Sequence, residues 1–316
     1  MIIVNDKPGQ LCNRLWAYSF FIAYALKQSI TIYIPHLKEY RQYFENLYSI
    51  PHVHFAVVKN LQSVDTLTFH SYRLITKVLR IISSWFNLHI PRIYLDPYNW
   101  TRESWRPSVL NKKGNIVFLG SWFHPKDVSA LLEYKDVIVK LFEPRTIYKN
   151  RVDTLFRELR NYQDVIVGIH IRRGDYARFY GGIYLFDDNV YKNYMKAVQD
   201  AFSGKRVCFF LSSDEMIVNS HFNGYKIAYL ERPVMVEDVY ALSQCDYILG
   251  PPSTFSMWAS FIGDVPLRIV KYKDEEIALD QFSPILYQNV FKNGEHFHHV
   301  GEDEFNARHK ILSLCE

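Results

Sequence analysis

The sequence predicts an α/β protein made of two Rossmann-like domains that face a central cleft. The chain has 316 residues, which is the length of two ordinary domains. Strand-like apolar runs alternate with helical stretches from the N-terminus, and the alternation starts again near residue 165. We place the domain boundary after residue 155, so the first domain spans 1–155 and the second 156–316.

The first domain opens with a strand, a glycine-containing turn, a helix and a second strand, which is the start of a βαβ unit. The expected strand at 2–4 is followed by a turn at 9–14, a helix at 15–27 and a strand at 29–35. Pro144 separates the last two helices of this half. The other expected elements are a cationic amphipathic helix at 73–86, a strand at 115–120, and helices at 128–142 and 148–162.

The second domain repeats the alternation more clearly. Its first strand is rich in Val and Ile, which is typical of parallel strands buried on both faces. We expect strands at 165–172, 207–212, 226–230, 246–250 and 267–270, and helices at 190–202, 236–244 and 255–262.

The composition excludes several classes of protein. With 48% hydrophobic residues the chain is globular, and a net charge of +4 is too small to indicate a nucleic-acid partner. The aromatic share of 16% is compatible with a sugar site, and equally with large cores and interfaces. The four cysteines have no metal-ligand spacing, which favours reduced thiols in the cytoplasm.

We expect a cytoplasmic protein. The N-terminus lacks the basic and apolar regions of a signal peptide, and no apolar run reaches the roughly 18 residues that a membrane span needs. The helix at 73–86 carries Arg73, Lys77 and Arg80, which suit a peripheral contact with the inner membrane surface. Packing of its apolar face within the protein is the favoured alternative.

The end of the strand at 165–172 is the most informative segment of the chain. His170, Arg172, Arg173 and Asp175 lie there within six positions. Ligands of open α/β sheets bind outside the carboxyl ends of the strands, and the planar donor fork of arginine suits phosphate. The segment therefore predicts a diphosphate-binding site. The alternative is a surface strand end whose arginines pair with nearby carboxylates.

Two further strand ends carry polar residues. Asp214 follows the strand at 207–212, where its carboxylate is suited to bind a base or ribose, or to cap the next helix. Ser253 and Thr254 lie between the strand at 246–250 and a helix whose first N–H groups favour anions; ordinary capping is the alternative. Because parallel strands end at one rim, we expect these groups to face the same phosphate as the arginines.

We predict no metal site. His296, His298 and His299 lack an acidic or cysteine partner with matching spacing. Asp187 and Asp188 do not form the Asp-x-Asp pattern of metal-dependent transferases.

Several of these segments together resemble one known family. The segment from Gly168 to Tyr176 resembles the His-x-Arg-Arg-Gly-Asp signature of GDP-fucose-dependent fucosyltransferases, most closely the α1,2-type family of bacteria and animals, which is glycosyltransferase family 11-like. Similar segments recur in the family's order across roughly residues 5–265; they are found at 9–13, 118–123, 211–214, 238–245 and 253–258.

The resemblance implies a GT-B fold, an inverting mechanism and no required metal or other cofactor. It implies that Arg172 holds the β-phosphate of GDP with support from Arg173, and that Ser253, Thr254 and the Phe255 N–H bind phosphate oxygens. His170 and Asp214 would fix the nucleoside. Asn13, in the N-terminal loop, would lie near the sugar or the acceptor.

The sequence departs from the family pattern at three places. Pro251 and Pro252 replace the residues before the Ser-Thr-Phe-Ser block, where the family usually has Asn; Arg14 follows Asn13 where Gln is usual; and Met257 replaces a Trp. The first two departures fall where the sugar or acceptor is expected. Two roles remain open for Asp175, which either acts as the general base or orients Arg172 through an ion pair.

We therefore expect a fucosyltransferase that moves fucose from GDP-fucose to a hydroxyl of an oligosaccharide or glycolipid, with an α1,2 linkage. The second half would bind the donor and the first half the acceptor. One alternative is a transferase of the same fold that uses another nucleotide sugar. The other is a non-catalytic protein that binds a nucleotide or glycan.

Overall fold

The structure is a computed structural model that describes residues 2–4, 7–55, 78, 81 and 129–285. The chain divides by its internal contacts into two compact units, residues 1–145 and 146–316. The boundary that we expected after residue 155 falls inside helix α6 (Thr146–Tyr162). This helix lies wholly in the second unit because it packs against helix α8 (Met235–Ser243) of that unit.

The first unit contains the predicted strand, turn, helix and strand. Its parallel sheet has the order β1 (Ile2–Ile3), β2 (Ile32–Tyr33) and β3 (Val53–His54), and helix α1 (Leu11–Lys27) connects the first two strands. The helix begins four residues earlier than expected, because the turn is complete at Gly9, whose φ is +37°. Pro35 begins the 3-10 helix η1 (Pro35–Tyr43), which limits the second strand.

The helix expected at 128–142 is divided in two. It consists of α4 (Ser129–Glu133) and α5 (Lys135–Leu141), which meet at Tyr134 with φ −106° and ψ 18°. Both helices contact α1. The helix expected at 73–86, apart from Val78 and Ile81, and the strand expected at 115–120 lie outside the described residues, as does the histidine-containing tail.

The second unit contains the five parallel strands that the sequence predicts. They are β4 (Val165–Ile171), β5 (Val207–Ser213), β6 (Ile227–Ala228), β7 (Tyr247–Gly250) and β8 (Leu267–Ile269), and their order in the sheet is β6-β5-β4-β7-β8. The chain crosses from one side of β4 to the other between β6 and β7. The chain therefore leaves the paired strands β4 and β7 in opposite directions across the sheet. The rim between the ends of these two strands is the topological switch point, where ligands of such sheets bind.

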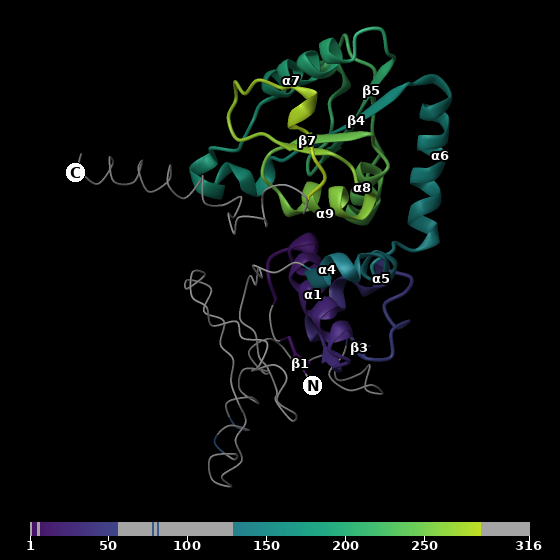
Figure 1. Cartoon of the computed structure of the whole chain (residues 1–316). Coiled ribbons are helices and arrows are strands. Elements are labelled where there is room, and N and C mark those ends of the chain that lie inside the picture. Colours follow the sequence, from purple (N-terminus) through teal and green to yellow (C-terminus); the bar gives the residue numbers. More distant parts are fainter. Residues whose placement is uncertain (1, 5–6, 56–77, 79–80, 82–128, 286–316) are drawn as a thin grey trace, which may run out of the picture. The chain divides into compact units, whose positions relative to one another are not determined.

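Helices cover both faces of this sheet (Figure 1). Side chains alternate between the faces of a strand. Val167, Ile169 and Ile171 of β4 share one core with helix α7 (Asp188–Ala201). Gly168 faces the other way, where a Cβ would lie 2.6 Å from the side chain of Leu242 in α8. This glycine therefore lets α8 pack directly on β4.

Helix α9 (Thr254–Gly263) lies beside α8, on the opposite side of the sheet from α7 (Figure 1). Four short 3-10 helices complete the described part of the second unit; these are η3 (Gly174–Ala177), η4 (Phe179–Gly182), η5 (Asn219–Phe222) and η6 (Leu279–Gln281).

Candidate functional site

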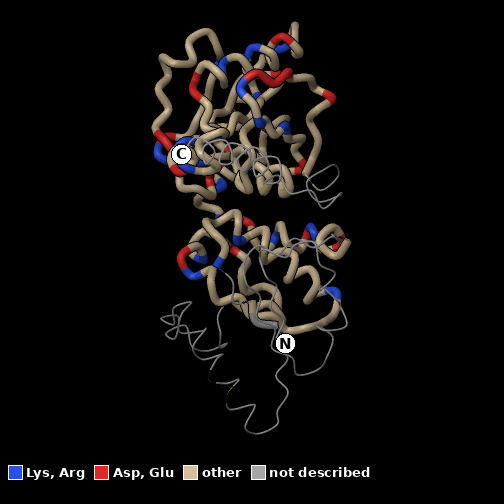
Figure 2. Tube along the Cα trace, turned by 90° about the vertical axis from the view of Figure 1, so that its left-hand side faces the viewer, with Lys and Arg blue, Asp and Glu red and all other residues tan. Residues whose placement is uncertain are grey.

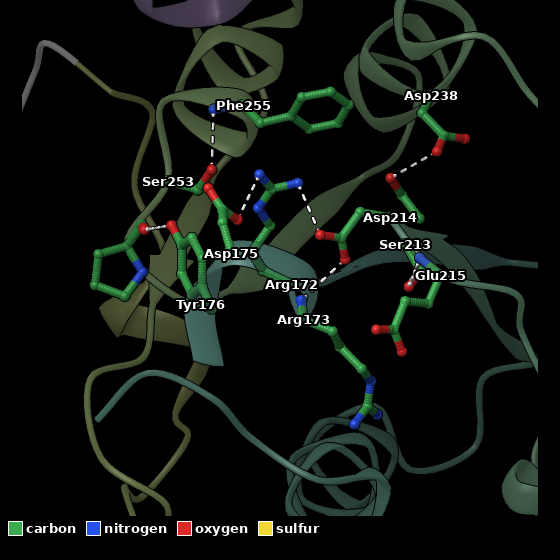
Figure 3. A network of polar contacts seen from close by, with 12 residues as sticks. Arg172, Arg173, Asp175, Tyr176, Ser213, Asp214, Glu215, Asp238, Ser253 and Phe255 are labelled. Carbon is green, nitrogen blue, oxygen red and sulfur yellow. Dashed lines mark hydrogen bonds and ion pairs between the residues drawn. The ribbon is translucent and has the colours of Figure 1, made fainter. Parts of the chain in front are cut away.

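The polar strand ends of the second unit meet at the switch point (Figure 3). Arg172 directly follows β4, Asp214 directly follows β5, and Ser253 precedes α9 after β7. Gly250 allows this approach, because a Cβ there would lie 2.8 Å from both the Cβ and the carbonyl oxygen of His170. The sequence prediction that these groups gather at one rim is therefore met for these three strand ends.

Arg172 is the centre of the cluster. Its Nη1 lies 3.0 Å from Asp214 Oδ2, and its Nη2 lies 2.8 Å from Asp175 Oδ1. The guanidinium also stands over the ring of Tyr176, 5.5 Å from the ring centre. These contacts hold the cation in place. Its side chain is 18% exposed, so part of it remains accessible to solvent.

Asp214 fixes the end of β4 in two ways. Its Oδ2 pairs with Arg172, while its Oδ1 accepts a hydrogen bond of 2.9 Å from the backbone N–H of Arg173. A Cβ on Gly174 would lie only 2.8 Å from Asp214 Oδ2, so glycine provides the space for this carboxylate. These contacts make Asp214 a support of the arginine in the structure, whereas the family resemblance assigned it to the nucleoside.

Arg173 turns away from Arg172 (Figure 3). Its guanidinium pairs with Asp188, the first residue of α7, and the second oxygen of that carboxylate lies 2.7 Å from His221 Nδ1. The sequence did not indicate either partner. In the sequence Asp188 stands out only as one of two adjacent acids, and the contact with His221 joins residues 33 positions apart.

The start of α9 shows the side-chain capping that the sequence left as the alternative to an anion site. Ser253 is the N-cap, and its hydroxyl accepts a hydrogen bond of 3.2 Å from the backbone N–H of Phe255. Thr254 is the first helical residue. The helix dipole at such an end favours a negative charge, so phosphate binding here stays a prediction. Asp175, Arg172 and Ser253 lie close together here (Figure 3).

His170 is buried beneath this surface. Its ring stacks on that of Phe255, with the ring centres 5.0 Å apart. Burial, with a smaller effect of the Arg172 charge, lowers the pKa of His170 to about 3. The imidazole is thus neutral at physiological pH, and its buried Nδ1 has no hydrogen-bond partner among the described residues.

Tyr176 belongs to the site although the sequence analysis gave it no role. It is 6% exposed and its hydroxyl donates to the carbonyl of Pro252, which ties η3 to the segment before α9. Burial raises the pKa of its hydroxyl to about 12. The ring packs on Phe179 with the centres 5.0 Å apart. In the sequence, the available signal for Tyr176 was its position directly after the Arg-Gly-Asp segment.

Asp238 is a second residue that the sequence analysis missed. This carboxyl of α8 is 6% exposed and accepts a hydrogen bond of 3.1 Å from the Ser212 hydroxyl at the end of β5. Burial raises the pKa of Asp238 to about 7, although the bond from Ser212 acts in the opposite direction. The available signal was an acidic pair, Glu237 and Asp238, within a segment whose other residues are mostly apolar.

Asn13 and Arg14 lie in the first turn of α1, in the first unit. A Cβ on Gly9 would lie 2.0 Å from Asn13 Nδ2, so the amide rests against the turn. Arg14 is 3% exposed and donates from Nη1 to the His36 carbonyl at 2.9 Å; it also pairs with Glu39 at 2.8 Å. Arg14, which stands where the family usually has Gln, thus holds the turn at Gly9 and η1 together.

Within the described ranges, no group of three or more His, Cys, Asp or Glu side chains is arranged to hold a metal ion. In that same part of the chain, no helix combines the length and apolar character that crossing a membrane requires. Acidic and basic residues are interspersed along the described trace (Figure 2).

Comparison with known proteins identifies the family. Residues 10–279 match the model of glycosyl transferase family 11. No curated protein matches the sequence. Matching solved structures include an arginine-to-lysine mutant of Arabidopsis thaliana FUT1 in complex with GDP, at 12% identity and a TM-score of 0.56, over 89% of this chain and 73% of that one.

Two further structures are similar. Fucosyltransferase NodZ from Bradyrhizobium has 15% identity and a TM-score of 0.52, over 84% of this chain and 93% of its own. POFUT1 in complex with GDP-fucose has 13% identity and a TM-score of 0.50, over 86% and 96%. These structures support the fold, and the predicted α/β fold class, GT-B, and the family resemblance are confirmed. The chain belongs to glycosyltransferase family 11 and is a glycosyltransferase.

Proposed function

We propose that this protein is an inverting fucosyltransferase that moves fucose from GDP-fucose to a glycan hydroxyl and forms an α1,2 linkage. The observation that carries the proposal is the position of Arg172 at the switch point, close to the N-terminus of α9. The family and the similarity to structures described with GDP and GDP-fucose support the choice of donor.

The chemistry of transfer explains why such a site is needed. When the acceptor hydroxyl attacks the anomeric carbon, the bond to the β-phosphate breaks and negative charge grows on GDP. Arg172 and the N–H groups of α9 are fixed donors at the place where this charge would appear. They stabilise the transition state more than the bound donor, which is the condition for catalysis.

We propose that these donors make a metal ion unnecessary. In this assignment Arg172 holds the β-phosphate, Ser253, Thr254 and the Phe255 N–H contact phosphate oxygens, and His170 lies toward the nucleoside. Asp214 positions Arg172. The guanidinium of Arg173 is held by Asp188. In this assignment Arg173 supports the phosphate indirectly, because its backbone N–H donates to Asp214, the residue that positions Arg172.

We assign the acceptor, an oligosaccharide or glycolipid, to the first unit, with Asn13 near the sugar or the acceptor. The turn that carries Asn13 is fixed by Arg14, whose Nε lies 3.3 Å from the Gly9 carbonyl oxygen. A rigid turn of this kind is suited to orient a substrate hydroxyl.

Titration with a panel of donors tests the proposal. GDP, GDP-fucose, GDP-mannose and UDP-sugars are compared by calorimetry, and each sugar nucleotide is then incubated with oligosaccharide acceptors in the presence of EDTA. We expect GDP and GDP-fucose to bind and only GDP-fucose to give product, with an α1,2 linkage. A preference for a UDP-sugar would contradict the donor assignment. Binding without any transfer or donor hydrolysis would contradict an enzymatic role.

A further inference from the structure

We propose that Asp175 occupies, on Arg172, the position that the donor's diphosphate takes, and that the donor frees this carboxylate to act as the base. This inference rests on the proposed function. The sequence left two roles open for Asp175, the general base or an ion-pair partner that orients Arg172. The inference assigns the ion pair to the protein without donor and the base to the protein with donor bound.

The two carboxylates on Arg172 differ in how firmly they are held. Asp214 is 22% exposed in its side chain and is fixed by the backbone N–H of Arg173 and the close approach of Gly174. The side chain of Asp175 is 60% exposed, and its ion pair is with the Arg172 Nη2. Exposed ion pairs contribute little free energy, so the pair with Asp175 is the one that separates readily.

The position of Asp175 is also the position suited to an anion. The carboxylate lies close to Arg172 and Ser253, next to the first N–H groups of α9 (Figure 3). Asp214 occupies the other terminal nitrogen of the guanidinium. A diphosphate that binds Arg172 together with α9 would approach the guanidinium on the side that Asp175 holds, and would compete with this carboxylate.

Charge supports the same exchange. One guanidinium already faces two carboxylates. Adding a diphosphate, which is more negative than a carboxylate, would place three anionic groups around one cation. Like charges at such distances repel strongly when they are partly shielded from water. Moving the Asp175 carboxylate off the guanidinium relieves this repulsion while Asp214 keeps Arg172 in place.

The released carboxylate remains next to the reacting atoms, because it follows Arg172 by three residues on η3. A carboxylate that no longer faces a cation accepts a proton more readily. The acceptor oxygen then forms its bond to the anomeric carbon, the bond to the β-phosphate breaks with its electron pair leaving on GDP, and the hydroxyl proton moves to Asp175. Donor binding thus precedes activation of the acceptor.

GDP titration of two matched variants tests the exchange. Asp175→Asn removes a competing charge, so we expect GDP to bind several-fold more tightly than to the wild type. Asp214→Asn loosens Arg172, so we expect binding roughly tenfold weaker or more. If Asp175 only braced the arginine, both variants would bind GDP more weakly, and that result would overturn the inference. Thermal unfolding of each variant checks that it is folded.

Transfer kinetics test the second half of the inference. With GDP-fucose saturating, Asp175→Asn should lower kcat by on the order of 100-fold, the usual contribution of a general base, and Asp175→Glu should restore part of it. Unchanged kcat in Asp175→Asn would overturn the base assignment. Failure of the wild-type protein to bind GDP would instead contradict the proposed function, so the two outcomes are distinguishable.

Discussion

Gly250 shows how a single residue shapes this site. Its lack of a side chain lets the end of β7 lie against His170 at a distance that no Cβ permits. The Arg172 end of β4 and the Ser253 cap after β7 can therefore come together. The sequence indicated that a strand ends at this place, but only the paired strands show why the residue must be glycine.

The residue types at the strand ends were predictable, and so was the ion pair of Asp175 with Arg172 as one of two alternatives, but the other partners were not. A charged residue after an apolar strand is visible in the sequence, so Arg172, Asp175 and Asp214 could be selected. The pairing of Arg173 with Asp188 depends on where α7 begins in space. The burial of Asp238 against Ser212 joins residues 26 positions apart. Such contacts are set by tertiary packing and leave no local pattern.

Asp238 gives a prediction at this scale. Burial raises its pKa in the folded protein to about 7, from an ordinary value of 3.8. The folded state therefore holds this proton more tightly, and the contribution of Asp238 to stability is complete below about pH 4 and is lost as the pH rises through about 7. The variant Asp238→Asn lacks this titrating group, so we expect it to lack this loss. Its free energy of unfolding, relative to that of the wild type, should therefore rise as the pH increases across that window.

Urea unfolding between about pH 4 and pH 8 measures this difference. His170 acts with the opposite sign, since its folded pKa of about 3 makes the protein less stable as the pH falls below 6.5. The comparison with Asp238→Asn removes this background because both proteins contain His170. A difference in stability that stays constant across the range would contradict the burial of an ionisable Asp238.

At the scale of elements, the bounds predicted from the sequence agree best with the structure for the longer strands and the helices of the second unit. The strands β4 and β5, of seven residues each, and the helices α7, α8 and α9 begin and end within two residues of the expected positions. Side-chain caps from Asp187 and Ser253 begin two of these helices.

Short elements were less predictable. The strands of the first unit have two residues each, too few to show a period, and β3 was not expected at all.

Helix α1 is buried on most of its surface, including Leu11 and Cys12 in its first turn. A helix of this kind lacks the polar face that marks where an amphipathic helix begins.

At the scale of the molecule, the division into two units gives a kinetic prediction. The second unit contains all the proposed donor-binding residues, whereas Asn13 lies in the first. We expect Asn13→Ala to lower kcat/KM for the acceptor by on the order of tenfold, the loss of about one hydrogen bond to substrate, while the Kd for GDP stays unchanged. Tyr48→Ala, at an exposed position of the same unit, is the control and should change neither value. A weaker Kd for GDP in Asn13→Ala would contradict the assignment of this residue to the acceptor side.

The central claim is that the guanidinium of Arg172 is the diphosphate clamp, and its neighbour Arg173 supplies the matched comparison. GDP titration by calorimetry, on folded Arg172→Ala and Arg173→Ala proteins, is the most direct measurement. We expect Arg172→Ala to weaken GDP binding by roughly 30-fold or more, as for the loss of charged hydrogen bonds of about 2 kcal/mol. It should also abolish transfer. Arg173→Ala should change the affinity only a few-fold, because that guanidinium is held on Asp188. Unchanged GDP affinity and turnover in Arg172→Ala would contradict the account.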